Sequence, residues 1–268
     1  MRLASFNILH GRSLDDGLVD VGRLTSACAS LEADVLGMQE VDRNQTRSDG
    51  RDQTAMVARA VDAVAWRFEP AIVGEPGGVW RAARDGDAVD TGEGGYGVGL
   101  VLRLPVRAWH VVRLPAAPVR SPVYATGSRR FLLLQDEPRV CLAAEVETPA
   151  GRMTVATTHL SFAPGWNVMQ LRRLTRALGR LTPPAQPCIL LGDLNVPGPV
   201  ARWASGWRSL ARVKTFPAPN PALQIDHALA HGRVPPVRSA RALALPVSDH
   251  RALVVDLARG RPGPAEVR

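Results

Sequence analysis

The stretch "ILLGDLNVPG", from Ile189 to Gly198, decides how the chain is interpreted. Its apolar start is typical of a buried strand, and the Pro-Gly pair at its end indicates a turn. Because side chains two positions apart on a strand share a face, Asp193 and Asn195 are predicted to lie side by side where the strand ends. Open α/β sheets usually place their chemistry at strand ends. The pair is therefore either a site or an ordinary turn.

The length and composition are those of one large domain. The chain has 268 residues, of which 46% are hydrophobic, enough to bury a substantial core. We expect a single domain over residues 1–258 and a flexible C-terminal tail over residues 259–268, where Pro and Gly are frequent. The net charge of +8 favours a phosphate-bearing partner only weakly, because the basic residues, all arginine except Lys214, are scattered along the chain.

Three cysteines, Cys28, Cys141 and Cys188, lie in apolar segments and are predicted to be buried packing residues. Their odd number and wide spacing suit neither a complete disulfide framework nor a cysteine-based zinc site. No leader precedes the first predicted strand, and no apolar run approaches the ~18 residues of a membrane helix. We therefore expect a cytoplasmic monomer without stable membrane insertion.

Hydrophobic periodicity predicts strands interleaved with helices in each half of the chain and hairpins in the middle. Helices are predicted to begin near Asp20 and to cover residues 51–64, 167–181 and 199–206. Residues 74–95, rich in Gly and Asp, are expected to form a mobile loop. The predicted strands cover residues 1–9, 34–41, 66–73, 96–103, 106–114, 129–135, 139–148, 152–161, 187–195, 224–230, 238–245 and 249–258. This order indicates two mixed sheets packed face to face, with helices outside.

Polar side chains stand at the ends of several predicted strands. Each alone has an ordinary explanation as a turn residue, a solvated carboxylate or a structural histidine. The set is harder to explain in that way, because buried carboxylates cost several kcal/mol unless they are paired or bound to a cation. Its members are Asn7, Glu40, His159, Asp193, Asn195, Asp226, Asp249 and His250.

The set suits a magnesium site. Mg²⁺ favours one or two carboxylates, with amide, water and substrate oxygens completing its octahedron. Glu40, helped by Asn7 and Asp249, fits that role, and Mn²⁺ is a possible substitute.

The remaining members suit phosphodiester hydrolysis. Asp193 would act as the base for the attacking water and Asn195 would orient that water. His250, held by Asp226, would be an oriented imidazolium that meets the developing negative charge, and His159 would add a second such group.

At these residues the sequence resembles the endonuclease/exonuclease/phosphatase superfamily of metal-dependent phosphoesterases. The matching motifs are "SFNILHG", "GMQEVD", "TTHLSF", "LLGDLN", "QIDHAL" and "SDHRAL", in the family's order and over nearly the whole chain. The resemblance implies a deoxyribonuclease-I-like fold, a four-layer α/β/β/α sandwich with the site at one edge of its two sheets. It also implies the metal role for Glu40, Asn7 and Asp249, and the catalytic roles for the other five residues.

The sequence lacks features that are typical of three subfamilies of this superfamily. Leu9 stands where apurinic endonucleases carry an acidic residue, and "QEVD" replaces their "QETK"-like motif, which disfavours DNA repair. The "WxGDxN" and "DRIL"-like signatures of inositol polyphosphate phosphatases are absent, as are the secretion signal and apolar hairpin of membrane-active sphingomyelinases.

The leading hypothesis is a Mg²⁺-dependent phosphodiesterase that acts on a nucleic acid or a small phosphate ester. A catalytically silent phosphate-binding or protein-interaction module of the same fold is one alternative. A phosphodiesterase acting on membrane lipids is another.

Overall fold

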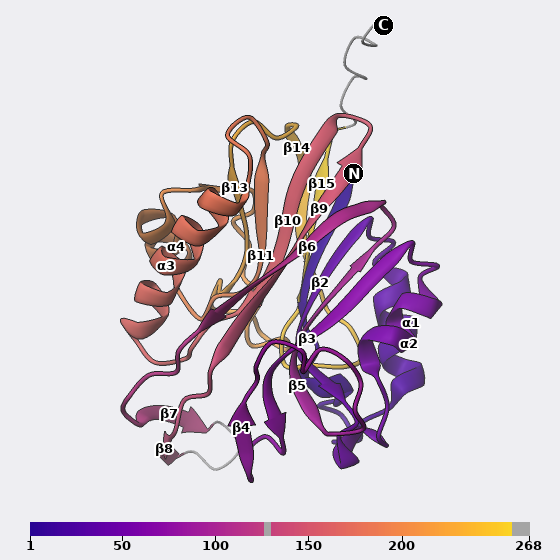
Figure 1. Ribbon diagram of the computed structural model, residues 1–268. Coiled ribbons are helices and arrows are strands. Elements are labelled where there is room, and N and C mark those ends of the chain that lie inside the picture. The colour runs from indigo at the N-terminus through magenta and orange to yellow at the C-terminus, as the bar shows by residue number, and fades with distance from the viewer. Residues whose placement is uncertain (126–129, 259–268) are drawn as a thin grey trace, which may run out of the picture.

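The computed structural model describes residues 1–125 and 130–258. Two β-sheets pack face to face, and helices cover the outer face of each, as the predicted four-layer α/β/β/α arrangement requires (Figure 1). The predicted tail over residues 259–268 lies outside the described residues, as does residue 129 of one predicted strand.

The first sheet has the strand order β14-β15-β1-β2-β5-β3-β4. β1 and β2 are parallel and all other neighbours are antiparallel, so the sheet is mixed. Its strands are β1 (Arg2–Asn7), β2 (Val35–Arg43), β3 (Ala65–Gly74), β4 (Trp80–Ala82), β5 (Gly95–Leu102), β14 (Val237–Leu243) and β15 (Ala252–Leu257).

The second sheet has the strand order β12-β13-β11-β10-β9-β6, and here β10 and β11 are the parallel pair. β7 and β8 form a separate antiparallel pair. The strands are β6 (Val106–Leu114), β7 (Ser121–Ala125), β8 (Arg130–Leu134), β9 (Arg139–Thr148), β10 (Gly151–His159), β11 (Cys188–Asp193), β12 (Arg208–Ser209) and β13 (Asp226–His231).

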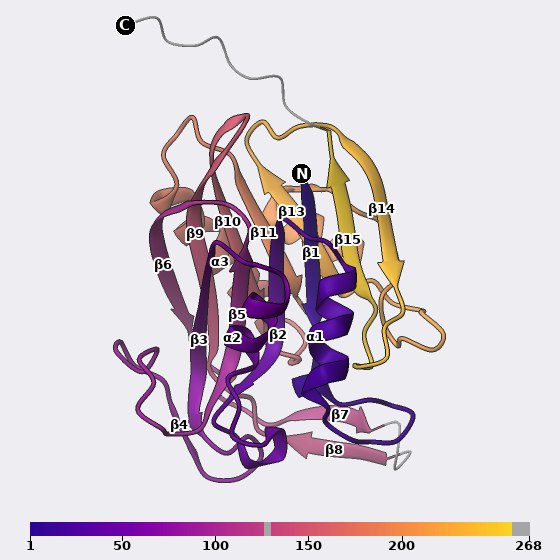
Figure 2. The same ribbon diagram turned by 90° about the vertical axis from the view of Figure 1, so that its right-hand side faces the viewer.

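Two pairs of helices form the outer layers. α1 and α2 cover the first sheet (Figure 2), and α3 and α4 cover the second. The helices are α1 (Val21–Ser30), α2 (Gln53–Ala60), α3 (Trp166–Leu181) and α4 (Gly198–Ser205), with 3₁₀ turns at Leu9–Gly11 and Thr46–Ser48. α1 begins beside Asp20 as predicted, and Asp20 caps it, because its carboxylate accepts a hydrogen bond from the Arg23 backbone N–H at 2.7 Å. None of the helices described is both long enough and apolar enough to cross a membrane.

Strand alternation divides the apolar residues into three cores. On β11, Ile189 and Leu191 face the opposite sheet, whereas Cys188 and Leu190 pack against α3 and α4. The third core lies between the first sheet and α1 and α2. All three cysteines are buried and free, as predicted. The same alternation positions the site. Asp193 lies two residues after Leu191 and four after Ile189, so its side chain also points into the space between the sheets.

The structure contains two strands that were not predicted, β7 and β12, and differs from the prediction in three further places. The predicted loop 74–95 contains the three-residue strand β4, too short to leave a periodic pattern. β2 runs past Glu40 to Arg43 with a bulge on the way. β15 begins at Ala252, so the Asp249-His250 pair precedes the last strand and does not open it.

Gly192 provides a test of how tightly the two parallel strands join beside the site. Its φ is +150°, and a Cβ there would lie 2.1 Å from the Thr158 carbonyl oxygen of β10. We expect Gly192→Ala to lower the free energy of unfolding by about 1–3 kcal/mol or more, because backbone must move.

Gly179→Ala on α3 is the control, since nothing lies within 4 Å of the new methyl group. Alanine should stabilise that helix by roughly 0.5–1 kcal/mol. Equal urea midpoints for the two variants would contradict the packing described.

Candidate active site

The polar residues predicted from strand ends lie at one edge of the two sheets, the lower edge in Figure 1. Parallel strands bring their carboxyl ends to this edge, and their antiparallel neighbours begin there. Asn7 ends β1, His159 and Asp193 end β10 and β11 in register with each other, and Asp226 begins β13 opposite Asp193. Glu40 lies in β2, and the turns beside these strands supply Asn195, Asp249 and His250.

The side-chain amide of Asn7 connects the two sheets. Its Nδ2 donates to Glu40 Oε1 at 2.9 Å and to Asp193 Oδ2 at 3.2 Å, while its Oδ1 accepts from the Leu9 backbone N–H at 3.1 Å. Asn7 is fully buried. One amide therefore fixes the separation of two carboxylates that come from different sheets.

Glu40 reaches the site through a β-bulge. The pairing of β2 with β5 shifts between Gln39 and Val41, and Glu40 takes a left-handed backbone conformation with φ +56°. Strict alternation would have placed it on the face of Met38, which packs toward α1 and α2. The bulge instead turns its carboxylate to Asn7. Burial raises the pKa of Glu40 and the Asp249 carboxylate adds to the rise, against the hydrogen bond from Asn7.

Glu40 and Asp249 form a carboxylate pair without a positive partner among the residues described. Neither makes an ion pair with an arginine, lysine or histidine within residues 1–125 and 130–258. Asp249 is half-buried, and its main-chain carbonyl accepts from the Ala218 N–H at 2.6 Å. Carboxylates are the donors that hard divalent cations bind, so Glu40 and Asp249 fit Mg²⁺. Asn7 presents its Nδ2 to Glu40 and its Oδ1 to the Leu9 N–H, so its amide would have to turn to bind the ion.

Asn195 is placed by a turn that follows β11. The strand ends at Asp193, and Asn195 has φ +51°. Its backbone N–H donates to Asp193 Oδ1 at 3.0 Å, and its Nδ2 donates to the Leu160 carbonyl at 3.0 Å and lies 3.2 Å from His159 Nε2. The predicted proximity to Asp193 is therefore correct, but an Asx-type turn produces it and strand alternation does not.

Asp226, His250 and Asp193 form a buried charged array. His250 Nδ1 lies 2.8 Å from Asp226 Oδ2, which also accepts from the Thr215 hydroxyl at 2.5 Å. His250 Nε2 faces Asp193 Oδ2 at 3.7 Å. Burial alone would lower the pKa of His250, but the two carboxylates outweigh it and raise the pKa to about 10. His250 is therefore a cation at neutral pH.

The pKa of Asp193 rises to about 7. Burial is the main cause; the positive charge of His250 opposes the rise, and the carboxylate of Asp226 adds to it. A carboxyl group with a pKa near neutrality can accept a proton efficiently at that pH.

His159 has the opposite electrostatic character to His250. Its Nε2 lies 3.5 Å from Asp193 Oδ2. Its pKa is held well below the ordinary value by burial and by the positive charges of Arg139 and His250. The sequence-based expectation of a second imidazolium at this position is therefore not what the electrostatics favour, because His159 stays neutral.

Sequence reasoning missed Arg139. It begins β9, is 6% exposed, and donates from Nη2 to Asp136 Oδ1 at 3.0 Å. It lines a small hollow with His159, Tyr96 and Glu137, and its Nε has no partner among the residues described. Its position follows from β9 being antiparallel to β10, which brings the start of β9 to the sheet edge where His159 ends β10. Nothing local distinguishes it from the other arginines.

Ser248 was also missed, and it holds the loop that carries two predicted site residues. Its hydroxyl donates to the Asn7 carbonyl at 2.6 Å and accepts from the His250 backbone N–H at 3.0 Å. This pair of hydrogen bonds attaches the segment from Ser248 to His250 to the end of β1.

The comparisons identify the family. The model of the Endonuclease/Exonuclease/phosphatase family matches residues 4–250. The chain belongs to this family. A comparison with curated proteins gave no match.

Solved structures of the family share the fold. An endonuclease/exonuclease/phosphatase from Beutenbergia cavernae is 21% identical, with a TM-score of 0.67 over 99% of this chain and 73% of its own. A mannosyl-6-phosphatase from Bacteroides thetaiotaomicron is 17% identical, with a TM-score of 0.64 over 96% and 99%. The catalytic domain of human nocturnin, solved with a bound sulfate anion, is 19% identical, with a TM-score of 0.63 over 96% and 94%. At sequence identities of 17–21%, the structural similarity to these proteins shows the fold alone.

A second group of side chains, beside Glu40 and Asp249, could also bind a metal ion. Atoms of Asp193, Asp226 and His250 lie within 4.8 Å of one another, close enough to surround an ion. A metal-bound imidazole must be neutral, however, and His250 is held in its protonated form by these same carboxylates. A cation between these three residues would therefore have to displace the proton of His250, whereas Glu40 and Asp249 carry no such competing proton on an imidazole.

The role of Asp226 in charging His250 is open to a direct test. We expect Asp226→Asn to lower the pKa of His250, because the neutral amide no longer favours the imidazolium. Side-chain ¹H–¹⁵N NMR across a pH series in EDTA measures this pKa. Asp256→Asn, on the outer end of β15, is the control and should leave His250 unchanged. An unaltered titration in Asp226→Asn would show that the pair does not set the charge.

The same shift predicts a pH dependence of stability. The pKa of folded His250 lies above the ordinary value of 6.5. Its pairing therefore stabilises the folded protein fully below about pH 6.5, and this contribution is lost as the pH rises toward about 10.

Proposed function

We propose that the chain hydrolyses a phosphodiester, with Mg²⁺ held by Glu40, Asn7 and Asp249. The observation that carries the proposal is the placement of Asp193, with its pKa near 7, between the Asn7 amide and the cationic His250. A base poised at neutral pH beside a fixed positive charge is the arrangement that attack by water on a phosphoryl group requires. When bound, Mg²⁺ would polarise a phosphoryl oxygen, and Mn²⁺ would substitute for it.

Asp193 would take the proton of the attacking water. Its Oδ1 is held by the Asn195 N–H and its Oδ2 by Asn7, so the carboxylate has a fixed orientation. The Asn195 amide nitrogen is engaged by Leu160, which leaves its Oδ1 to accept a hydrogen bond from the same water. Such positioning limits the approach to one line on the phosphorus.

His250 would stabilise the negative charge that grows on the phosphoryl oxygens. Asp226 holds Nδ1, so the Nε2 proton points into the site toward Asp193. The neutral His159, whose Nε2 faces the same Asp193 oxygen, would contact a phosphate oxygen, and the neighbouring Arg139 would add positive charge. These groups do not have to reorganise during the reaction.

Two alternatives are less well supported. A silent binding module would lack part of the catalytic set, whereas all the predicted residues gather at one edge. A lipid phosphodiesterase would need an apolar surface around the site, and the small hollow beside His159 places the charged Arg139 and Glu137 among apolar neighbours such as Val98 and Val140. The substrate could still be a nucleic acid or a small ester.

Asp193→Asn tests the proposed base. With bis(p-nitrophenyl) phosphate and Mg²⁺ we expect kcat/KM to fall by about 10²–10⁴-fold, because the amide keeps the shape but cannot take the proton. Asp62→Asn is the matched control, since Asp62 is exposed and its left-handed φ of +51° is one that asparagine tolerates. The proposal fails if wild type and Asp193→Asn show the same background rate.

Glu40→Gln tests the proposed metal site without measuring activity. Mg²⁺ at about 100 times its Kd should stabilise the wild type by about 2.7 kcal/mol, seen as a higher Tm, and should not raise the Tm of the variant. In EDTA at neutral pH the variant should be no less stable than the wild type. The reason is that folding raises the pKa of Glu40 above its ordinary value of 4.5. At any pH above 4.5 the ionised Glu40 therefore lowers the free energy of unfolding.

The exposed Glu75→Gln is the control and should keep the full Mg²⁺ response. A wild-type Tm that ignores both Mg²⁺ and Mn²⁺, or a Glu40→Gln variant that responds like the wild type, would place the cation elsewhere.

A further inference from the structure

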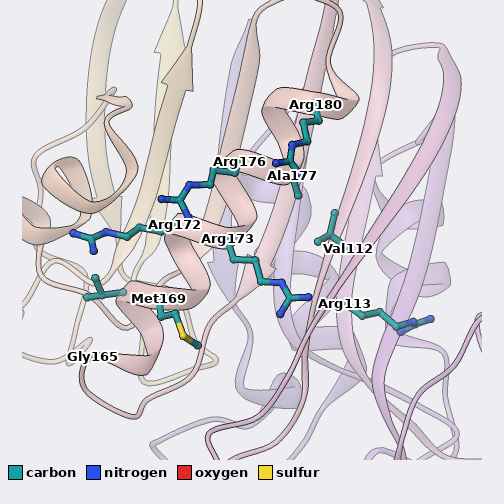
Figure 3. Close-up of a pocket in the computed structure, with 10 residues that line it drawn as sticks. Val112, Arg113, Gly165, Met169, Arg172, Arg173, Arg176, Ala177 and Arg180 are labelled. Carbon is teal, nitrogen blue, oxygen red and sulfur yellow. The ribbon is translucent and has the colours of Figure 1, made fainter.

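The outer face of α3 carries a row of arginines that the proposed reaction does not use. Arg172, Arg173, Arg176 and Arg180 fall within about 100° of the helix circumference. Figure 3 shows Arg172 and Arg176 projecting to one side of the helix and Arg173 to the other, toward β6. The helix contains no aspartate or glutamate between Trp166 and Leu181. Its charge is therefore of one sign along its whole length.

This row is not what holds α3 in place. The helix is anchored by Leu171, Leu174 and Leu178, which are buried against the second sheet. Like charges four residues apart, as at Arg172, Arg176 and Arg180, each destabilise a helix by about 0.2–0.5 kcal/mol. No carboxylate within residues 1–125 and 130–258 forms an ion pair with any of these arginines. The row is therefore slightly unfavourable for the fold, and no carboxylate in the described part of the chain compensates for it.

The arginines border a hollow between α3 and β6. The hollow has a volume of about 700 Å³, and Val112 and Arg113 of β6 form its other side. Figure 3 shows Arg173 pointing toward the strand that carries Arg113. Arg113 is already bound to Glu69 at 2.7 Å, so the positive charge available to a ligand comes from α3.

An aromatic ring extends the same surface. Trp203 of α4 is 69% exposed, and the Arg172 guanidinium lies 4.3 Å from its ring centroid. A large exposed aromatic side chain next to unpaired arginines offers both a stacking surface and phosphate ligands. We call Arg172, Arg173, Arg176, Arg180 and Trp203 together the arginine groove.

The arginine groove begins beside the catalytic edge. Gly165, which precedes α3 and lines the hollow, lies in the segment that follows His159. At the first turn of α3, Asn167 Nδ2 donates to the Asn195 carbonyl at 2.7 Å. From there the 16-residue helix leads away from the site for about 24 Å.

We propose that the arginine groove binds the sugar–phosphate backbone of a single-stranded nucleic acid. Arginines at positions i, i+4 and i+8 offer a guanidinium about every 6 Å along the helix, suited to a chain of successive phosphates. A flexible strand can enter a hollow between a helix and a strand, whereas a flat bilayer meets protruding surfaces. The proposal goes beyond the proposed hydrolysis, because binding here requires neither the metal nor cleavage.

The test measures binding of a fluorescent single-stranded DNA by anisotropy, with the full chain in EDTA so that no cleavage occurs. The DNA has about 20 nucleotides, longer than the ~4–16 that one single-strand site covers. We expect the triple variant Arg173→Gln/Arg176→Gln/Arg180→Gln to bind at least about tenfold more weakly at low salt. The slope of log K against log salt should fall by about 2, since each phosphate contact contributes about 0.7.

Trp203→Ala should weaken binding on the order of tenfold and leave the salt slope unchanged, because stacking releases no counterions.

The matched control removes the same charge from elsewhere. Arg152, Arg233 and Arg238 are exposed and form no ion pair within the described part of the chain, so their triple Gln variant should bind like the wild type. Hydrolysis of bis(p-nitrophenyl) phosphate should be unchanged in the groove variant, which separates this proposal from the proposed function. If the wild-type protein binds DNA through the groove but hydrolyses no phosphodiester, only the proposed function is overturned.

Three outcomes would overturn the groove proposal. The wild type fails to bind the DNA; the control and groove variants lose affinity equally, which indicates net charge alone; or the groove variant keeps DNA binding and loses binding to vesicles containing phosphatidylglycerol, which indicates a membrane surface.

Discussion

The hydrogen bonds of one buried amide are the constraint on which the site depends. Asn7 donates to a carboxylate of its own sheet and to one of the opposite sheet, so the two halves of the sandwich cannot separate at this edge without breaking its hydrogen bond to Asp193. Deeper between the sheets, Gln39 Nε2 donates to the Thr157 hydroxyl at 2.9 Å. A Cβ on Gly37 would lie 2.7 Å from that hydroxyl oxygen. Close packing of the sheets thus sets the distance between the proposed metal ligands and the proposed base.

The electrostatics of the edge follow from that packing. Four carboxylates gather where water is largely excluded, which is unfavourable unless positive charge is brought to them. The protein supplies one cation itself, because Asp226 and Asp193 together keep His250 protonated. Glu40 and Asp249 make no ion pair with the residues described, and His250 and Arg139 offset the rise in the pKa of Glu40 only in part; a divalent cation would correct that imbalance. The same packing keeps His159 neutral, so the two histidines have different electrostatic roles.

The sequence predicted the fold class and the convergence of the polar set, because alternation with a period of two fixes which face of a strand each residue occupies. Asn7 and Asp193 lie where that rule places them. Glu40 does not, since a bulge overrides the alternation that would have put it beside Met38, and a bulge depends on pairing with a distant strand. Arg139 could not be found either, because its place at the edge is a consequence of strand order, which no local pattern records.

The central claim is that water, activated at Asp193, attacks the phosphorus directly and in line. The configuration at phosphorus after hydrolysis of a chiral phosphorothioate diester, with Mg²⁺ and in ¹⁸O-labelled water, tests it most directly. A single displacement by water predicts inversion, with the labelled oxygen in the phosphorothioate product. Retention of configuration would contradict the account, because it requires a covalent intermediate with a protein side chain and hence a nucleophile other than water.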